Sequence, residues 1–163
     1  MNLLYPFDAE LDSDVRLQLL GRKAAGLNEM TALGIPVPPG FTITTDVGRT
    51  YQTSGALPEG LEAAVASALR IVEERLGRGF GDADKPLLLS IRSGAEVSMP
   101  GMMDTVLNIG LGERTLRGLA AQRGDERFAL DAYRRLLQMY GSVVRGIGAD
   151  RFQHLLSDLK HDL

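Results

Sequence analysis

The sequence contains no cysteine, and only two of its 163 residues, His154 and His161, are histidine. The absence of cysteine excludes disulfides, thiolate metal sites and thiol nucleophiles. Two histidines give little support to a His-based metal site. Any metal bound by this chain would therefore need oxygen ligands.

Long apolar runs and an excess of positive charge are also missing. No window approaches the roughly 18 apolar residues of a membrane span, and the acidic start lacks the pattern of a secretory signal. The formal net charge is -3, which gives no field that would hold a nucleic-acid backbone. Hydrophobic residues at 44% and charged residues at 24% are typical of a globular domain. We expect a cytoplasmic protein without nucleic-acid or membrane partners.

The first half of the chain mixes strand and helix patterns. A helix is expected from Gly21 to Gly34, with Ala24, Leu27 and Leu33 close to one face and Gly34 as its stop signal. Two further helices, one running toward Thr53 and one over 61–76, and two strands, within 2–7 and 41–45, complete this half.

In the second half, Leu87 to Ile91 is an apolar segment of strand length with one polar residue, Ser90, and it predicts a buried central strand. A second strand is expected from Thr105 to Leu111, and only helix patterns follow, over 113–121, 125–146 and 151–159. The order of elements predicts an α+β fold with an α/β lobe over 1–112 and a helical subdomain over 113–163.

The loop between the two strands, Arg92 to Asp104, has a composition suited to phosphate. Glycines such as Gly94 and Gly101 let a backbone approach a ligand closely, and exposed amide N–H groups can form an anion-binding concavity. Arg92 at the strand end is placed to grip the same oxygens. For the glycines alone, an ordinary structural turn is the favoured alternative.

Other side chains of this loop add to its chemistry. Met99, Met102 and Met103 are flexible thioethers suited to pack on an adenine face, although core packing is the commoner role. Asp104 would accept a hydrogen bond within the loop or orient Arg92.

Lys23 stands at the expected start of a helix, directly after Gly21 and Arg22. A helix N-terminus carries partial positive charge and free N–H donors, so a lysine there is unfavourable unless an anion is nearby. The alternative is a solvated surface lysine.

These segments together resemble the N-terminal nucleotide-binding region of the pyruvate, phosphate dikinases. The resemblance begins around Leu20 with LGRKAAGLNEM and continues through TALGIPVPPGFTITT. It is most specific in SIRSGAEVSMPGMMDTVLNIGLG, and it resumes in FALDAYRRLLQMYGSVVRGI, so that it spans almost the whole chain.

The resemblance implies the N-terminal lobe of an ATP-grasp domain, in which two lobes enclose Mg-ATP and pass a phosphoryl group to a histidine on a separate domain. The complete enzymes convert ATP, pyruvate and phosphate to AMP, phosphoenolpyruvate and diphosphate. By position, Lys23 and Arg92 would contact the ATP phosphates as catalytic cations. The implied nucleotide-binding residues are Gly94, Gly101, Met102, Met103, Asp104 and Thr105.

The resemblance also implies what lies elsewhere. The Mg²⁺ ligands are expected mainly in a second lobe, and that lobe, the phosphohistidine domain and a pyruvate barrel would be supplied by a partner chain. The surface facing them would be partly apolar, which predicts self-association into a homo-oligomer.

A non-catalytic binding or assembly module is the alternative function. The family's Gly-Gly-Lys-Gly reads Gly21-Arg22-Lys23-Ala24 here, and Glu96 replaces a residue that is usually basic or small. A carboxylate near a triphosphate repels it unless Mg²⁺ intervenes.

Overall fold

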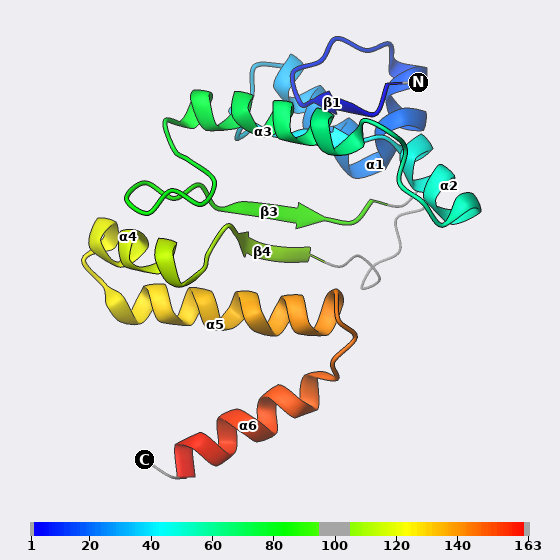
Figure 1. The fold of residues 1–163 in the computed structure, drawn as a ribbon. Helices are drawn as coiled ribbons and strands as arrows, with labels where there is room; N and C mark the ends of the chain where they lie inside the picture. The colour runs from blue at the N-terminus through cyan, green and yellow to red at the C-terminus, as the bar shows by residue number, and fades with distance from the viewer. Residues whose placement is uncertain (1, 95–104, 162–163) are drawn as a thin grey trace. The chain divides into compact units, whose positions relative to one another are not determined.

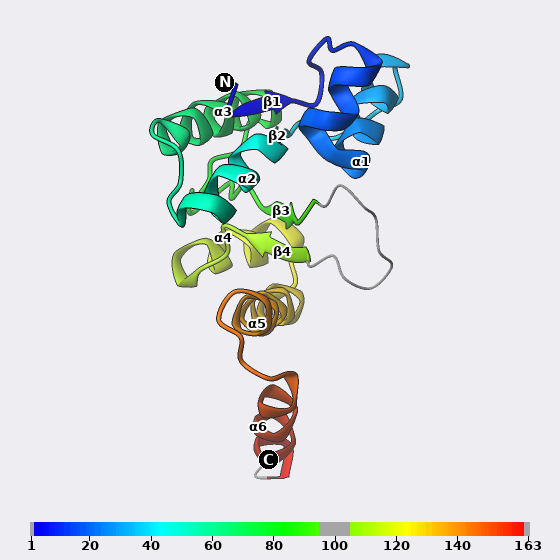
Figure 2. The same ribbon diagram turned by 90° about the vertical axis from the view of Figure 1, so that its right-hand side faces the viewer.

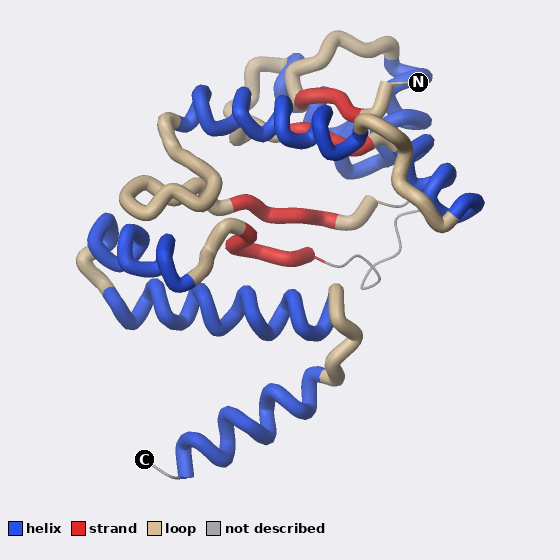
Figure 3. Tube along the Cα trace, viewed as in Figure 1, coloured by secondary structure: helices blue, strands red, loops and turns tan. Residues whose placement is uncertain are grey.

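A computed structural model describes residues 2–94 and 105–161 of the chain (Figure 1). The described residues form a mixed α+β structure that is mostly helical, with two small two-stranded sheets (Figure 3). The chain divides into two compact units, and each is described by itself. Unit 1 comprises Met1–Gly77 and Ser93–Met103, and unit 2 comprises Arg78–Arg92 and Asp104–Leu163.

The sheet of unit 1 pairs the two strands expected in the first half of the chain. Strand β1 (Leu4–Pro6) runs antiparallel to β2 (Phe41–Ile43), with Tyr5 opposite Thr42. The prolines at 36, 38 and 39 precede β2, where no helix can form. Immediately after β2, the buried Thr44 continues the pairing, because its backbone N–H donates to Leu3 O at 3.0 Å.

Three helices complete unit 1, and Figure 2 gives a second view of them. They are α1 (Ser13–Ala32), α2 (Thr45–Ser54) and α3 (Leu61–Leu76). The predicted helices and the stop signal at Gly34, which has a φ of 76°, are confirmed. Arg75 at the end of α3 pairs with Asp8 at 2.7 Å, which ties that helix to the loop after β1.

The residues expected on one face of this helix are only partly covered. Ala24 and Leu27 are half-buried, Leu33 lies just beyond α1 and is exposed, and the fully buried positions after Gly21 are Ala25 and Asn28. Asn28 can be buried because its amide donates to two backbone carbonyls, those of Phe7 and Ala9, each at 2.8 Å. The apolar pattern of the helix therefore did not identify the two residues that are fully buried.

The sheet of unit 2 consists of β3 (Leu89–Arg92) and β4 (Thr105–Ile109), which run antiparallel. The two strands are confirmed, but the prediction of a buried central strand is wrong. β3 has one sheet neighbour among the described residues, and its last three residues are exposed. The buried part of the apolar run lies before the strand, at Pro86 and Leu87. The apolar pattern of this segment therefore predicted burial correctly at its start and wrongly along the strand itself.

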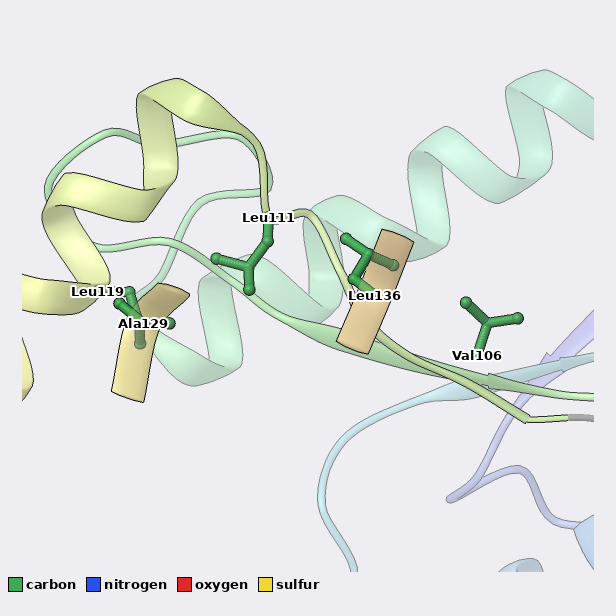
Figure 4. Close-up of a cluster of buried hydrophobic side chains, with 5 residues drawn as sticks. All are labelled: Val106, Leu111, Leu119, Ala129 and Leu136. Atoms are coloured by element: carbon green, nitrogen blue, oxygen red, sulfur yellow. The ribbon is translucent and has the colours of Figure 1, made fainter. Parts of the chain in front are cut away.

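Helices α4 (Glu113–Arg123), α5 (Glu126–Val143) and α6 (Ala149–His161) follow the sheet, as the periodicity predicted. α5 runs along β4, and side chains from β4, α4 and α5 form the core of unit 2 (Figures 1 and 4). That core consists of Val106, Leu111, Leu119, Ala129 and Leu136. In α6 no residue is buried.

Unit 2 thus contains the strands β3 and β4 together with the C-terminal helices. A domain boundary at Gly112 stays a prediction. No helix of the described residues is long and apolar enough to cross a membrane.

Candidate phosphate-binding elements

Helix α1 is broken at Gly21, in the middle of its range. Gly21 has φ 72° and ψ 164°, so two helical segments meet at a kink there. This combination of angles is essentially restricted to glycine, because a Cβ would clash with the backbone. A residue in this conformation cannot continue the ladder of i to i-4 hydrogen bonds, so a new helix starts directly after it.

Lys23 is the second residue of that new helix. Its side chain is exposed, and no carboxylate among the described residues forms an ion pair with it. The N–H groups of the first turn of a helix carry the positive end of the helix dipole. An exposed ammonium group at such a helix start is an arrangement suited to phosphate oxygens.

Arg92 and Thr105 form a second element, in unit 2. They are directly opposite each other in the β3–β4 register, at the open end of the strand pair. The ladder has a register shift between Leu89 and Ile91, so the strand is irregular just before Arg92. The Arg92 side chain is exposed. A guanidinium and a hydroxyl thus lie on neighbouring strand ends.

The remaining predicted site residues are distributed between the described and undescribed parts of the chain. Gly94 is described and exposed. Gly101, Met102, Met103 and Asp104 lie outside the described residues, as do Met99 and Glu96. Since Lys23 lies in unit 1 and Arg92 in unit 2, their convergence on one anion stays a prediction.

Two residues that support the break at Gly21 were missed by the sequence reasoning. Asn28 fastens the helix after the break to the loop after β1. Thr45 donates from Oγ1 to Gln18 O at 2.6 Å, which fastens the helix before the break to the start of α2. The sequence signal for Asn28 was a polar residue within the apolar pattern of the helix. Nothing local in the sequence indicates the partner of Thr45.

Two concavities in the described part of the chain lie at other places. One, of about 180 Å³, is mostly apolar and lies between the β1–β2 sheet and α3, where Phe41, Ala68 and Ile71 line it. The other, of about 600 Å³, is open, and it is lined by Asp84 from the turn before β3 and by Arg114 and other residues of α4. Neither is lined by Lys23, Arg92 or Thr105. The two phosphate-binding elements are therefore surface features of each unit.

Perturbed carboxyl groups are found at turns and helix surfaces. Backbone N–H groups of Lys85 and Asp84 hold the pKa of Asp82 below its ordinary value of 3.8. Hydrogen bonds from Arg134, together with Arg135, likewise lower the pKa of Asp131. Both carboxylates are exposed and support local structure, and neither adjoins Lys23 or Arg92 in the sequence. They are not general acids or bases for a reaction near neutral pH.

A metal site is not formed by the described residues. Within 2–94 and 105–161 no group of three or more His, Asp or Glu side chains is placed to hold a metal ion. The groups of the two candidate elements are the cations Lys23 and Arg92, the Thr105 hydroxyl and the backbone N–H groups after Gly21.

Comparison with known protein families gives a match to the pyruvate phosphate dikinase AMP/ATP-binding domain over residues 17–68. That range contains the break at Gly21, Lys23, Asn28 and Thr45. The family model thus covers the first of the two candidate phosphate-binding elements and the residues that support it.

Whole-sequence comparison extends the similarity over most of the chain. Pyruvate, phosphate dikinase of Giardia intestinalis is 49% identical over 155 residues, which are 95% of this chain and 18% of that enzyme. Pyruvate, phosphate dikinase 2 of Zea mays is 54% identical over 144 residues, 88% of this chain and 16% of the enzyme. The enzyme of Rhizobium meliloti is 51% identical over 142 residues, again 16% of its length.

These findings confirm the resemblance seen in the sequence. At about 50% identity over most of its length, the chain is similar to the AMP/ATP-binding region of the pyruvate, phosphate dikinases. It spans 16% to 18% of the length of the relatives described.

Proposed function

We propose that this chain is the ATP-binding lobe of a phosphotransferase of the pyruvate, phosphate dikinase type. The observation that carries the proposal is the break at Gly21, which starts a helix with the exposed Lys23 in its first turn. This element lies inside the range that matches an AMP/ATP-binding family model. A helix start with a free lysine is a physical reason for that match.

The chemical role proposed for the lobe is to hold and neutralise the phosphates. N–H groups after Gly21 and the Lys23 ammonium would bind phosphate oxygens, and Arg92 would add a planar cation able to bind two oxygens at once. Thr105, opposite Arg92, would donate its hydroxyl to the same group. As charge redistributes during phosphoryl transfer, such fixed donors stabilise the transition state.

The proposal assigns only part of a dikinase reaction to this chain. Its described residues offer no metal site, so the ligands that complete Mg²⁺ binding, and the acceptor histidine, are proposed to come from segments that correspond to the rest of the relatives. In the complete reaction, ATP, pyruvate and phosphate would give AMP, phosphoenolpyruvate and diphosphate. The chain alone is expected to bind nucleotide without turning it over.

Titration with Mg-ATP tests the proposal. The full chain, labelled with ¹⁵N, should show saturable shifts of the amides of 21–24 and of Arg92 and Thr105 at millimolar or lower Mg-ATP. Lys23→Met should weaken binding about tenfold or more, because a hydrogen bond to a charged group is lost. Lys160→Met is the matched control, since it removes the same charge from α6.

The outcomes separate the two functions considered for this chain. Loss of affinity in Lys23→Met with normal affinity in Lys160→Met supports phosphate binding at the break. If both variants bind as the wild type does, Lys23 has no such role. If the folded wild type shows no amide shifts at millimolar Mg-ATP, the nucleotide site is absent, and a non-catalytic binding or assembly module is then the better description.

A further inference from the structure

We infer that Thr45 is a positioning residue for the phosphate-binding helix start, acting through the carbonyl of Gln18. The inference rests on the proposed function for its consequence in nucleotide binding. Its structural part stands on contacts within unit 1 alone. Thr45 is not proposed to touch the nucleotide.

The first step concerns the carbonyl that lies just before the break at Gly21. Gln18 is in the last turn of the first helical segment, three residues before Gly21, which has a non-helical conformation. The Gln18 carbonyl accepts the Thr45 hydroxyl at 2.6 Å. The contact thus joins the end of the first helical segment to the first residue of α2.

The second step is that the Thr45 hydroxyl is oriented. Arg49 Nη2 lies 3.4 Å from Thr45 Oγ1 and donates to it, while the same nitrogen pairs with Asp46 Oδ1 at 2.6 Å. A hydroxyl that accepts from a guanidinium has its own proton available for another acceptor. The Arg49–Asp46 pair on α2 therefore favours donation from Thr45 toward Gln18.

The third step is that Thr45 stands on a fixed support. Its neighbour Thr44 is buried and donates twice to the residues just before β1, through N–H to Leu3 O at 3.0 Å and through Oγ1 to Asn2 O at 3.2 Å. Val47 is also buried. Thr45 is consequently held at the junction of β2 and α2, and the bond to Gln18 fixes the end of the first helical segment relative to that junction.

The fourth step is that the segment after the break is anchored separately. Asn28, which is 1% exposed, donates to Phe7 O and Ala9 O, each at 2.8 Å. The two sides of the break therefore have different anchors, Thr45 before it and Asn28 after it. With both anchors in place, the direction in which the N–H groups of 22–24 point is determined by the unit and not by a flexible glycine.

Three variants of the full chain test this inference. Thr45→Val keeps the shape and removes the hydroxyl, and Thr45→Ser keeps the hydroxyl. Thr53→Val is the matched control, because among the residues that the structure describes the Thr53 hydroxyl bonds only carbonyls of its own helix, Arg49 O and Thr50 O, each at 3.0 Å. Each variant is measured for amide chemical shifts, for Mg-ATP and adenosine affinity, and for urea unfolding.

Thr45→Val should move the amide resonances of 22–24 and weaken Mg-ATP binding about fivefold, the effect of one hydrogen bond. Adenosine has no phosphates, so its affinity should change less. A general loss of folding would instead lower both affinities together. Thr45→Ser and Thr53→Val should leave the amides of 22–24 and Mg-ATP affinity within about twofold of the wild type.

The inference is overturned if Thr45→Val leaves the 22–24 amides unchanged, whether or not the chain binds nucleotide. It is also overturned if Thr45→Ser behaves as Thr45→Val does, because the hydroxyl would then not be the cause. If the wild type binds no Mg-ATP, the proposed function fails, while the amide shifts of the variants still decide the role of Thr45.

Discussion

Replacing Gly21 with alanine separates the conformation at the break from every other property of the helix. Gly21 has φ 72° and ψ 164°, a combination that costs a residue with a Cβ about 1 to 3 kcal/mol. The variant can accept that strain or escape it by making α1 continuous. A continuous helix would give the N–H groups of 22–24 intrahelical acceptors and remove them from the proposed phosphate site.

Gly26→Ala is the matched control for this variant. Gly26 lies five residues later in α1, and a Cβ added there meets nothing within 4 Å. Alanine inside a helix is more stable than glycine by about 0.5 to 1 kcal/mol. The same substitution should therefore destabilise the chain at position 21 and stabilise it at position 26, with a gap of about 1.5 to 4 kcal/mol between the two variants.

Urea unfolding followed by far-UV circular dichroism gives the free energies of unfolding, and an Mg-ATP titration of the folded variants gives the affinities. Gly21→Ala should lose stability and nucleotide affinity together, and Gly26→Ala should keep its affinity. Equal stability of the two variants would refute the assigned conformation of Gly21. A destabilised Gly21→Ala with wild-type affinity for Mg-ATP would refute the link between the break and phosphate binding.

Two further predictions concern unit 2. Gly118→Ala should lose about 1 to 3 kcal/mol of stability in urea unfolding, because an added Cβ would collide with the backbone carbonyl of Ala83; an unchanged midpoint would contradict the packing of α4 on that turn. Asp82→Asn should flatten the acid limb of stability: the pKa of Asp82 is lowered in the folded state, so its contribution is present above pH 3.8 and is lost as pH falls through the lowered value. Unfolding free energies measured from pH 5 to pH 2 check this, and parallel curves for variant and wild type would disprove it.

Local sequence patterns predicted most of the secondary structure of the described residues. The 3.6-residue periodicity and a glycine stop signal gave the helices, because these signals act within a few residues of the chain. The same reasoning placed a helix start after Gly21 and a cation in its first turn, which is the first candidate phosphate-binding element. The resemblance to the pyruvate, phosphate dikinases was also evident from the sequence, since its motifs are contiguous segments.

Tertiary structure decided what those patterns could not. Leu87 to Ile91 is apolar apart from Ser90, yet the exposure of β3 depends on how many strands lie beside it, and the sequence pattern does not contain that number. The pairing of Arg92 with Thr105 depends on the register across a loop. The bond between Thr45 and Gln18 joins residues 27 positions apart.

The physical reason is the range of the interactions. Helix propensity, turns and stop signals are set by neighbouring residues, so the sequence by itself predicted the helices and a helix start after Gly21. Which polar side chain meets which carbonyl is chosen only when distant segments pack, as for Asn28 and Thr45. The sequence therefore predicted the helix start after Gly21, and the tertiary structure decided what holds the break in α1 in place.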